Sequence, residues 1–135
     1  MTKEALTYYH AALNYHFFGG ELEPAIFDIT EKGDGVTATF IDVTDPFLIE
    51  FDEDFINECD DELFILTILL HEMTHEYCYM FDICDIDENG DHSEEFEEAA
   101  EEHGLTFSGY KLTDEAKTKI ERIIAHYNAV KGTCK

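Results

Sequence analysis

The residues best suited to do chemistry are the two histidines and the glutamate of the pentapeptide HEMTH at residues 71–75. They lie in a stretch, residues 63–81, that is rich in Leu and Ile and lacks Gly and Pro, so we expect a buried helix there. On a helix, His71 and His75 share one face and both imidazoles can bind one metal ion. Glu72 points about 100° away, where it can accept a proton from water beside the metal. This division of roles is that of a zinc hydrolase.

A chance match to this pattern on a core helix is the simpler alternative, with both histidines satisfied by other partners. Burying two imidazoles on an otherwise apolar helix costs free energy unless each has a partner. A metal ion supplies that partner, which favours the metal site.

A zinc site needs a third protein ligand and an open fourth position. His92 directly precedes an expected helix at residues 93–103, capped by Ser93, and Gly90 allows the chain ahead of it to turn back. Glu94 or Glu95 would complete a two-histidine, one-carboxylate site that is chemically as suitable.

His103 is a further candidate, but its position near the end of the same helix, before Gly104, favours an interaction with the helix dipole. Most of the acidic residues between 94 and 102 are expected to form a solvated helix face.

Residues 69–75 and 90–96 together resemble the SprT-like zinc metallopeptidases, in which a third histidine precedes Glu-Phe at the start of the next helix. Residues 13–24 resemble the opening helix of that family and its exit, so the resemblance spans about residues 5–107. It implies that His71, His75 and His92 hold Zn²⁺ and that Glu72 is the catalytic base. It also implies a zincin-like α+β fold.

The sequence departs from the family in two ways. The usual Gly-His-Gly around the third ligand is Asp91-His92-Ser93, and the loop before it is longer and more acidic. The zinc ribbon that follows the protease part in many members is also missing, because no Cys-x-x-Cys pair occurs among the four cysteines, which are Cys59, Cys78, Cys84 and Cys134. We expect these cysteines to be free thiols.

A calcium-binding loop is a competing interpretation of residues 85–96. Asp85, Asp87 and Asn89 stand at loop positions 1, 3 and 5 of an EF-hand, and Gly90 stands at position 6. Position 12, which requires a bidentate glutamate, is Phe96. The simpler alternative is an acidic turn whose Asp and Asn side chains stabilise the local backbone.

The length of 135 residues predicts a single domain over residues 1–135. A formal net charge of -24, from 32 acidic and 8 basic residues, disfavours direct binding to nucleic acid and to anionic membranes. The chain opens without an apolar leader segment and has no run of 18 apolar residues, so we expect a cytoplasmic protein.

Hydrophobic periodicity predicts an α+β domain, with a small antiparallel sheet packed against the HExxH helix and flanking helices. With the resemblance, this implies a zincin-like minimal metalloprotease domain. Helices are expected over residues 3–18, 52–58, 61–81 and 93–103, and a last one follows a cap at residues 113–115. Residues 25–29 and 36–41 are expected to pair as a hairpin through residues 31–35, and residues 47–51 to form a third strand. If residues 47–51 are the edge beside the metal helix, they could bind an extended substrate by strand addition.

The apolar face of the first helix is expected to consist of Leu6, Tyr9, Leu13 and Phe17. The stripe of the last helix is Ile120, Ile123, Ile124 and Tyr127, which is expected to be core.

These features predict a zinc-dependent endopeptidase of the HExxH type that acts on a protein or peptide substrate, and the acidic composition favours a basic one. Tyr110 and His103 are candidates for the residue that stabilises the oxyanion. The alternatives are a non-catalytic metal-binding or acidic interaction module, including the calcium loop at residues 85–96.

Overall fold

The computed structural model describes residues 1–33, 35–107 and 109–133, with backbone only for residues 132 and 133. Cys134 and residue 34 of the expected hairpin turn lie outside this description. The helices are α1 (Lys3–Phe18), α2 (Glu53–Glu58), α3 (Glu62–Met80), α4 (Glu94–Glu102) and α5 (Asp114–Thr133). The strands are β1 (Ala25–Thr30), β2 (Ala38–Ile41), β3 (Phe47–Asp52), β4 (Leu105–Thr106) and β5 (Lys111–Leu112).

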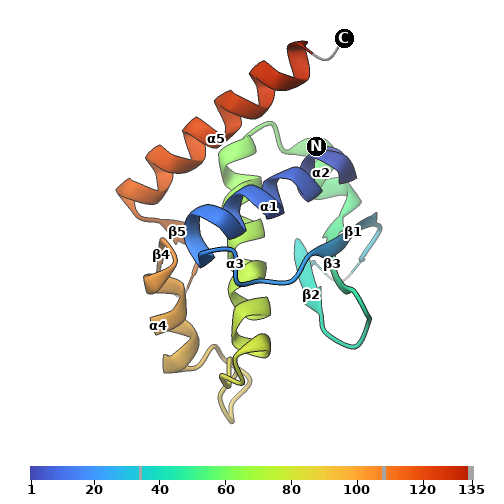
Figure 1. Cartoon of the computed structure of the whole chain (residues 1–135). Helices are drawn as coiled ribbons and strands as arrows, with labels where there is room; N and C mark the ends of the chain where they lie inside the picture. The colour runs from blue at the N-terminus through green and yellow to red at the C-terminus, as the bar shows by residue number, and fades with distance from the viewer. Residues whose placement is uncertain (34, 108, 134–135) are drawn as a thin grey trace.

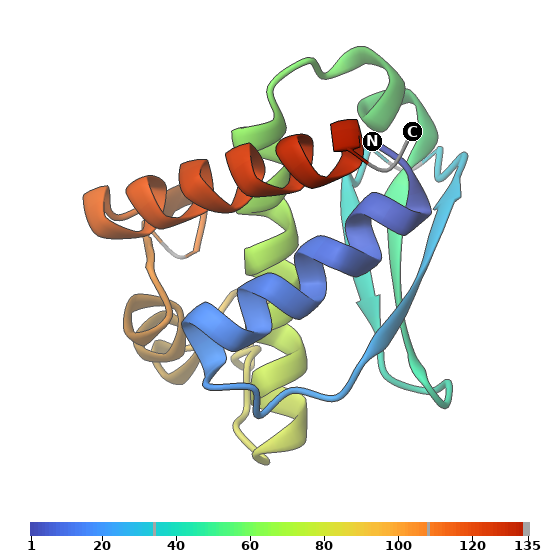
Figure 2. The same cartoon turned by 45° about the horizontal axis from the view of Figure 1, so that its top comes forward.

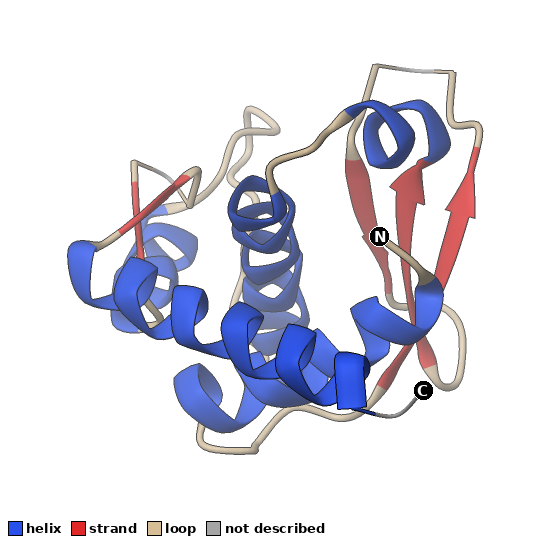
Figure 3. Ribbon diagram, turned by 90° about the horizontal axis from the view of Figure 1, so that it is seen from above, coloured by secondary structure: helices blue, strands red, loops and turns tan. Residues whose placement is uncertain are grey.

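Helix α3 runs through the middle of the molecule (Figure 1). The three-stranded sheet lies on one side of it, and α4 with the β4–β5 pair lies on the other (Figure 3). Helices α1 and α5 both cross α3 (Figure 2), and α1 also packs on β1. Because α3 contacts both halves of the fold, side chains along it can meet residues from the sheet and from the α4 region.

The sheet is mixed, so the expected antiparallel sheet is wrong in part. Its strand order is β1-β3-β2, with β1 parallel to β3 and β2 antiparallel to β3. The hairpin expected between residues 25–29 and 36–41 is therefore also wrong, because β3 lies between these two strands. Ile49 and Phe51 of β3 are fully buried, which explains the result: the most deeply buried strand occupies the centre.

The expectation that residues 47–51 form the edge beside the metal helix is corrected as well. The strand adjacent to α3 is β2, and its edge faces the helix. Any strand addition beside the candidate metal site would therefore use β2.

The predicted helices are confirmed, and side-chain caps explain where they begin. Asp61 accepts a hydrogen bond from the N–H of Phe64 at the start of α3, and Ser93 accepts one from Phe96 at the start of α4. Thr113 accepts one from Ala116 in the first turn of α5. The caps therefore fix the residue at which each of these helices begins.

The predicted apolar faces are largely confirmed. In α1, Leu6, Tyr9 and Leu13 are buried, but Phe18 is buried in place of Phe17, which is only half-buried. The stripe of α5 is core, since Ile120 and Ile123 are buried and the other two members pack against the same cluster. The α+β class is thus confirmed. Within the described residues no helix is long and apolar enough to cross a membrane.

Candidate metal centre

Three histidines from two separate segments converge. His71 and His75 lie one turn apart on α3, and His92 lies in the segment that leads into α4. One ring nitrogen from each lies within 4.8 Å of the other two, and the Nε2 atoms of His71 and His75 are 3.3 Å apart. Among the described residues this is the group of His, Cys, Asp and Glu side chains gathered closely enough to hold a metal ion.

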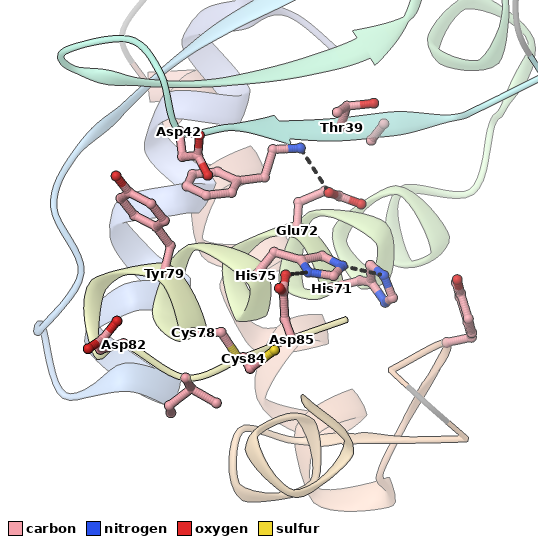
Figure 4. A pocket seen from close by; sticks show the side chains of 14 residues that line it. Thr39, Asp42, His71, Glu72, His75, Cys78, Tyr79, Asp82, Cys84 and Asp85 are labelled. Carbon is pink, nitrogen blue, oxygen red and sulfur yellow. Dashed lines mark hydrogen bonds and ion pairs between the residues drawn. The ribbon is translucent and has the colours of Figure 1, made fainter. Parts of the chain in front are cut away.

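In two of these rings, the Nδ1 atom, which faces away from the shared space, contacts a hydrogen-bond acceptor. Nδ1 of His71 lies 2.9 Å from the carbonyl oxygen of Gly109. Nδ1 of His75 lies 2.7 Å from Oδ2 of Asp85 (Figure 4). A carbonyl or carboxylate oxygen only accepts, so both Nδ1 atoms carry the hydrogen. Each Nε2 therefore presents its lone pair to the shared space, as metal-binding histidines require.

Burial also favours the neutral imidazoles. Burial lowers the pKa of His71 to about 4, although the hydrogen bond to Gly109 acts in the opposite direction. Burial likewise lowers the pKa of His75 and of His92, and in both cases Asp85 opposes the shift. Because only a neutral imidazole nitrogen binds a metal, these environments prepare all three rings as ligands.

Phe96 orients two of the ligand rings. Its ring stacks on His92, with centroids 4.2 Å apart and planes 22° apart, and on His75 at 4.4 Å and 26°. Phe96 is fully buried in the first turn of α4. A buried aromatic side chain at this position ties the start of α4 to the face of α3 that carries the histidines.

Glu72 lies in the same cavity but outside the group of three histidines. Its side chain is only 8% exposed, and Oε1 accepts a hydrogen bond of 3.0 Å from the backbone N–H of Phe40 in β2 (Figure 4). Burial raises the pKa of Glu72 to about 8, while the N–H of Phe40 and the charge of Lys32 act to lower it. A carboxyl group with such a pKa can both take up and release a proton near neutral pH.

The alternative third ligands do not join this group. Glu94 and Glu95 are exposed on α4. His103 caps the C-terminal end of that helix, where its Nδ1 donates a hydrogen bond to the Ala99 carbonyl at 2.6 Å. Its ring stacks on Phe18 at 4.3 Å and does not line the cavity, so His103 lies at the helix end, as expected.

The acidic loop is organised around its own backbone and the histidines. Asp85 is engaged by His75, and Oδ1 of Asp87 accepts hydrogen bonds from the N–H groups of Asn89 and Asp91. Phe96, at the position of the missing bidentate glutamate, is buried. These contacts fit the acidic turn better than a calcium loop.

A cavity of about 560 Å³ opens beside the three histidines. Its lining comes from β2, α3, the loop after α3 and the turn before β5: Ala38, Thr39, Phe40, Asp42, His71, Glu72, His75, Cys78, Tyr79, Asp82, Ile83, Cys84, Asp85 and Tyr110. Tyr110 stacks on His71, with centroids 4.6 Å apart, and its side chain is 55% exposed. Of the two candidates for oxyanion stabilisation, Tyr110 is therefore at the cavity and His103 is not.

The roles of four residues at this site were not expected from the sequence: Gly109, Phe96 and Phe40, and also Asp85, which was considered only as a calcium ligand. Gly109 holds His71 through its carbonyl, but glycines in turns are common and give no local signal of such a role. Phe96 follows the third histidine by four residues, which on a helix start is a detectable spacing. The contact from Phe40 to Glu72 depends on the sheet order, which local pattern does not determine.

Comparison of the sequence with protein-family models found no match. Comparison with curated proteins found no similar sequence either. A function for this chain is therefore inferred from its site geometry.

Proposed function

We propose that this chain is a zinc-dependent metallopeptidase with a zincin-like fold of the SprT-like kind. The observation that carries the proposal is the convergence of His71, His75 and His92 within 4.8 Å, with Glu72 in the same cavity. Three neutral imidazoles with an open side suit catalytic zinc better than calcium or magnesium, which prefer oxygen ligands.

The hydrogen bonds behind the histidine rings also fit a zinc site. The Gly109 carbonyl and the Asp85 carboxylate each hold one Nδ1 hydrogen, which fixes the ring orientation and the tautomer of His71 and His75. When bound, zinc supplies a Lewis acid that polarises a scissile carbonyl and makes water a better nucleophile.

The chain's own residues would then move the proton. Glu72 accepts a proton from the attacking water and passes it to the leaving amine as the carbon–nitrogen bond breaks. The N–H of Phe40 holds one carboxylate oxygen and leaves the other available, because Oε2 has no hydrogen bond to a described residue. Tyr110 donates a hydrogen bond to the oxyanion that develops on the substrate.

The edge of β2 would position the substrate. The backbone N–H of Phe40 points away from β3 and toward α3, since it reaches Glu72. An extended peptide that pairs with the backbone groups of this edge other than the N–H of Phe40, which Glu72 already engages, would bring its scissile bond between Glu72 and the three histidines.

Metal analysis combined with hydrolysis tests this function. The wild-type chain should bind about one zinc per molecule and cleave an unstructured protein such as casein. Glu72→Gln should keep the zinc and lose hydrolysis by about 10³-fold or more. Glu95→Gln, an exposed control on α4, should keep both.

Two outcomes would count against the proposal. Equal hydrolysis by wild type and Glu72→Gln would remove the catalytic role of this carboxylate. Tight zinc binding without hydrolysis of any peptide would favour the alternative of a non-catalytic metal-binding module with an acidic surface.

A further inference from the structure

The cavity beside the three histidines continues toward the C-terminal end of α3, where its chemistry differs. Asp42 directly follows β2 and Asp82 follows Phe81, the C-cap of α3, and both line the cavity (Figure 4). Tyr79, in the last turn of α3, lines the same end. Among the described residues that line the cavity, none is a lysine or an arginine.

Tyr79 presents an aromatic ring in this cavity. It contacts Phe40 at a centroid distance of 6.3 Å and Phe47 at 5.6 Å, yet its side chain is 53% exposed. A ring supported by two neighbours and open to the cavity offers its π-surface to a ligand. Such a surface attracts the cation of a lysine or arginine side chain.

The two carboxylates at this end are available for a ligand. Asp42 and Asp82 are both exposed, and neither forms an ion pair with a basic residue in the described part of the chain. Asp85, by contrast, is already engaged by His75. The C-terminal end of α3 adds the negative end of its helix dipole to the same region.

We propose that this end of the cavity is a specificity subsite that binds a lysine or arginine side chain of the peptide substrate. The assignment rests on the proposed peptidase function, since it places the basic side chain on a peptide whose scissile bond lies at the three histidines. The aliphatic stem of the side chain packs along Phe40 and Tyr79, and the cation lies between the ring of Tyr79 and the carboxylates of Asp42 and Asp82. The subsite thus combines an aromatic wall, a cavity and uncompensated negative charge.

A binding experiment decides whether the subsite exists without requiring hydrolysis. Two blocked octapeptides, identical except for one lysine or one norleucine, are titrated at about 0.15 M salt into ¹⁵N-labelled Glu72→Gln protein with zinc. The lysine peptide should bind about tenfold more tightly, with amide shift changes concentrated in residues 40–42 and 79–83. Shift changes spread over the acidic surface, or equal binding of the two peptides, would overturn the proposal.

A charge-matched pair of double variants separates the subsite from the general negative charge. Asp42→Asn with Asp82→Asn should reduce the preference for lysine to about twofold or less. Glu58→Gln with Glu98→Gln, at exposed sites on α2 and α4, removes the same charge and should leave the preference intact. Equal effects of the two double variants would show that only net charge matters, and would overturn the subsite.

Hydrolysis of a peptide library by the wild-type chain tests the proposed function separately. Mass spectrometry of the products should show lysine or arginine enriched at one fixed position relative to the cleaved bond. Lysine-dependent binding at residues 40–42 and 79–83 without any cleavage would retain the subsite and reject the peptidase. Cleavage without enrichment of basic residues would reject the subsite and retain the peptidase.

Discussion

The carbonyl oxygen of Gly109 accepts the Nδ1 hydrogen of His71 at 2.9 Å, and a side chain at Gly109 would collide with that same ring. A Cβ atom built there would lie 2.8 Å from Nδ1 of His71 and 3.2 Å from the ring of Phe96. Gly109 also adopts a φ of +87°, which disfavours other residues. The absence of a side chain therefore allows the backbone of the β4–β5 turn to approach and orient a candidate metal ligand.

Gly109→Ala should weaken zinc binding by about 10- to 100-fold, because it displaces the ring of His71 or breaks its outer hydrogen bond. Gly20→Ala is the matched control, since Gly20 has a similar φ of +76° but no atom within 4 Å of its Cβ position. Both variants should lose about 1 kcal/mol of stability from the strained φ. Competition with a fluorescent chelator measures the affinities, and equal losses in both variants would contradict the role of Gly109.

Asp85→Asn should also weaken zinc binding by about 10- to 100-fold, because the 2.7 Å contact from His75 loses its charged acceptor. Asp87→Asn is the control in the same loop, since an asparagine Oδ1 can still accept the hydrogen bonds from Asn89 and Asp91. Isothermal titration with zinc and with calcium distinguishes the two interpretations of residues 85–96. Calcium binding that disappears with Asp87→Asn would restore the calcium loop.

The sequence predicted most of the candidate site, because its signals are local. Two histidines four residues apart on an apolar helix define a shared face from helix geometry alone. Ser93 capped α4 as expected, which placed His92 at a helix start aimed back at α3. Caps and helical periodicity depend only on residues that are close together in the sequence. The positions that they determine can therefore be predicted from a single sequence.

The order of the strands could not be obtained in the same way. Residues 25–29 and 36–41 are close in sequence and strand-like, so a hairpin was the simplest pairing. The parallel pairing of β1 with β3 depends on contacts far apart in the chain and on which strand is most deeply buried. The edge that faces Glu72 follows from that order, and so the contact from Phe40 to Glu72 was not predicted.

Glu72→Gln should stabilise the metal-free chain at alkaline pH. Burial raises the pKa of Glu72 from 4.5 to about 8, so folding favours its protonated form. The free energy of unfolding of the wild type therefore falls as the pH rises from about 4.5 toward and through 8. The Glu72→Gln variant shows no such fall, because glutamine does not titrate. In the presence of a chelator, the variant should gain about 1–3 kcal/mol over wild type between pH 5 and pH 8.5.

Urea denaturation at the two pH values measures this difference in the free energy of unfolding. The lowered pKa values of the three histidines are common to both proteins and do not affect the comparison. Glu95→Gln, at an exposed position, should show no rise of this kind. If wild type and Glu72→Gln differed in free energy of unfolding by the same amount at both pH values, the carboxyl group of Glu72 would be well solvated.

Tyr110→Phe should lower kcat by about 100-fold while zinc content and KM change little, because it removes one hydrogen-bond donor to the oxyanion. The ring that stacks on His71 is retained, so the ligand geometry should stay intact. Tyr15→Phe, at an exposed position on α1 outside the cavity, removes a tyrosine hydroxyl away from the site and should leave kcat unchanged. A rise in KM alone for Tyr110→Phe would assign this residue to substrate binding.

The charge of the chain predicts that it does not bind DNA directly at about 0.15 M salt. Nucleic-acid affinity comes largely from Lys and Arg that neutralise phosphates, and the chain has 8 such residues against 32 acidic ones. Lys3 pairs with Asp28 and Lys32 with Glu50. The basic residues of α5, which are Lys117, Lys119, Arg122 and Lys131, share that helix with the acidic residues Asp114, Glu115 and Glu121.

Fluorescence anisotropy with single- and double-stranded oligonucleotides should therefore show no binding at micromolar protein concentrations. The same experiment at about 0.02 M salt is the sensitive control, because a weak electrostatic contact strengthens as salt is removed. Micromolar binding at the higher salt that weakens steeply with further salt would mean that the basic residues of α5 act together against the net charge. In that event, removing charge with Lys119→Gln and Arg122→Gln should reduce the slope of log affinity against log salt by about two.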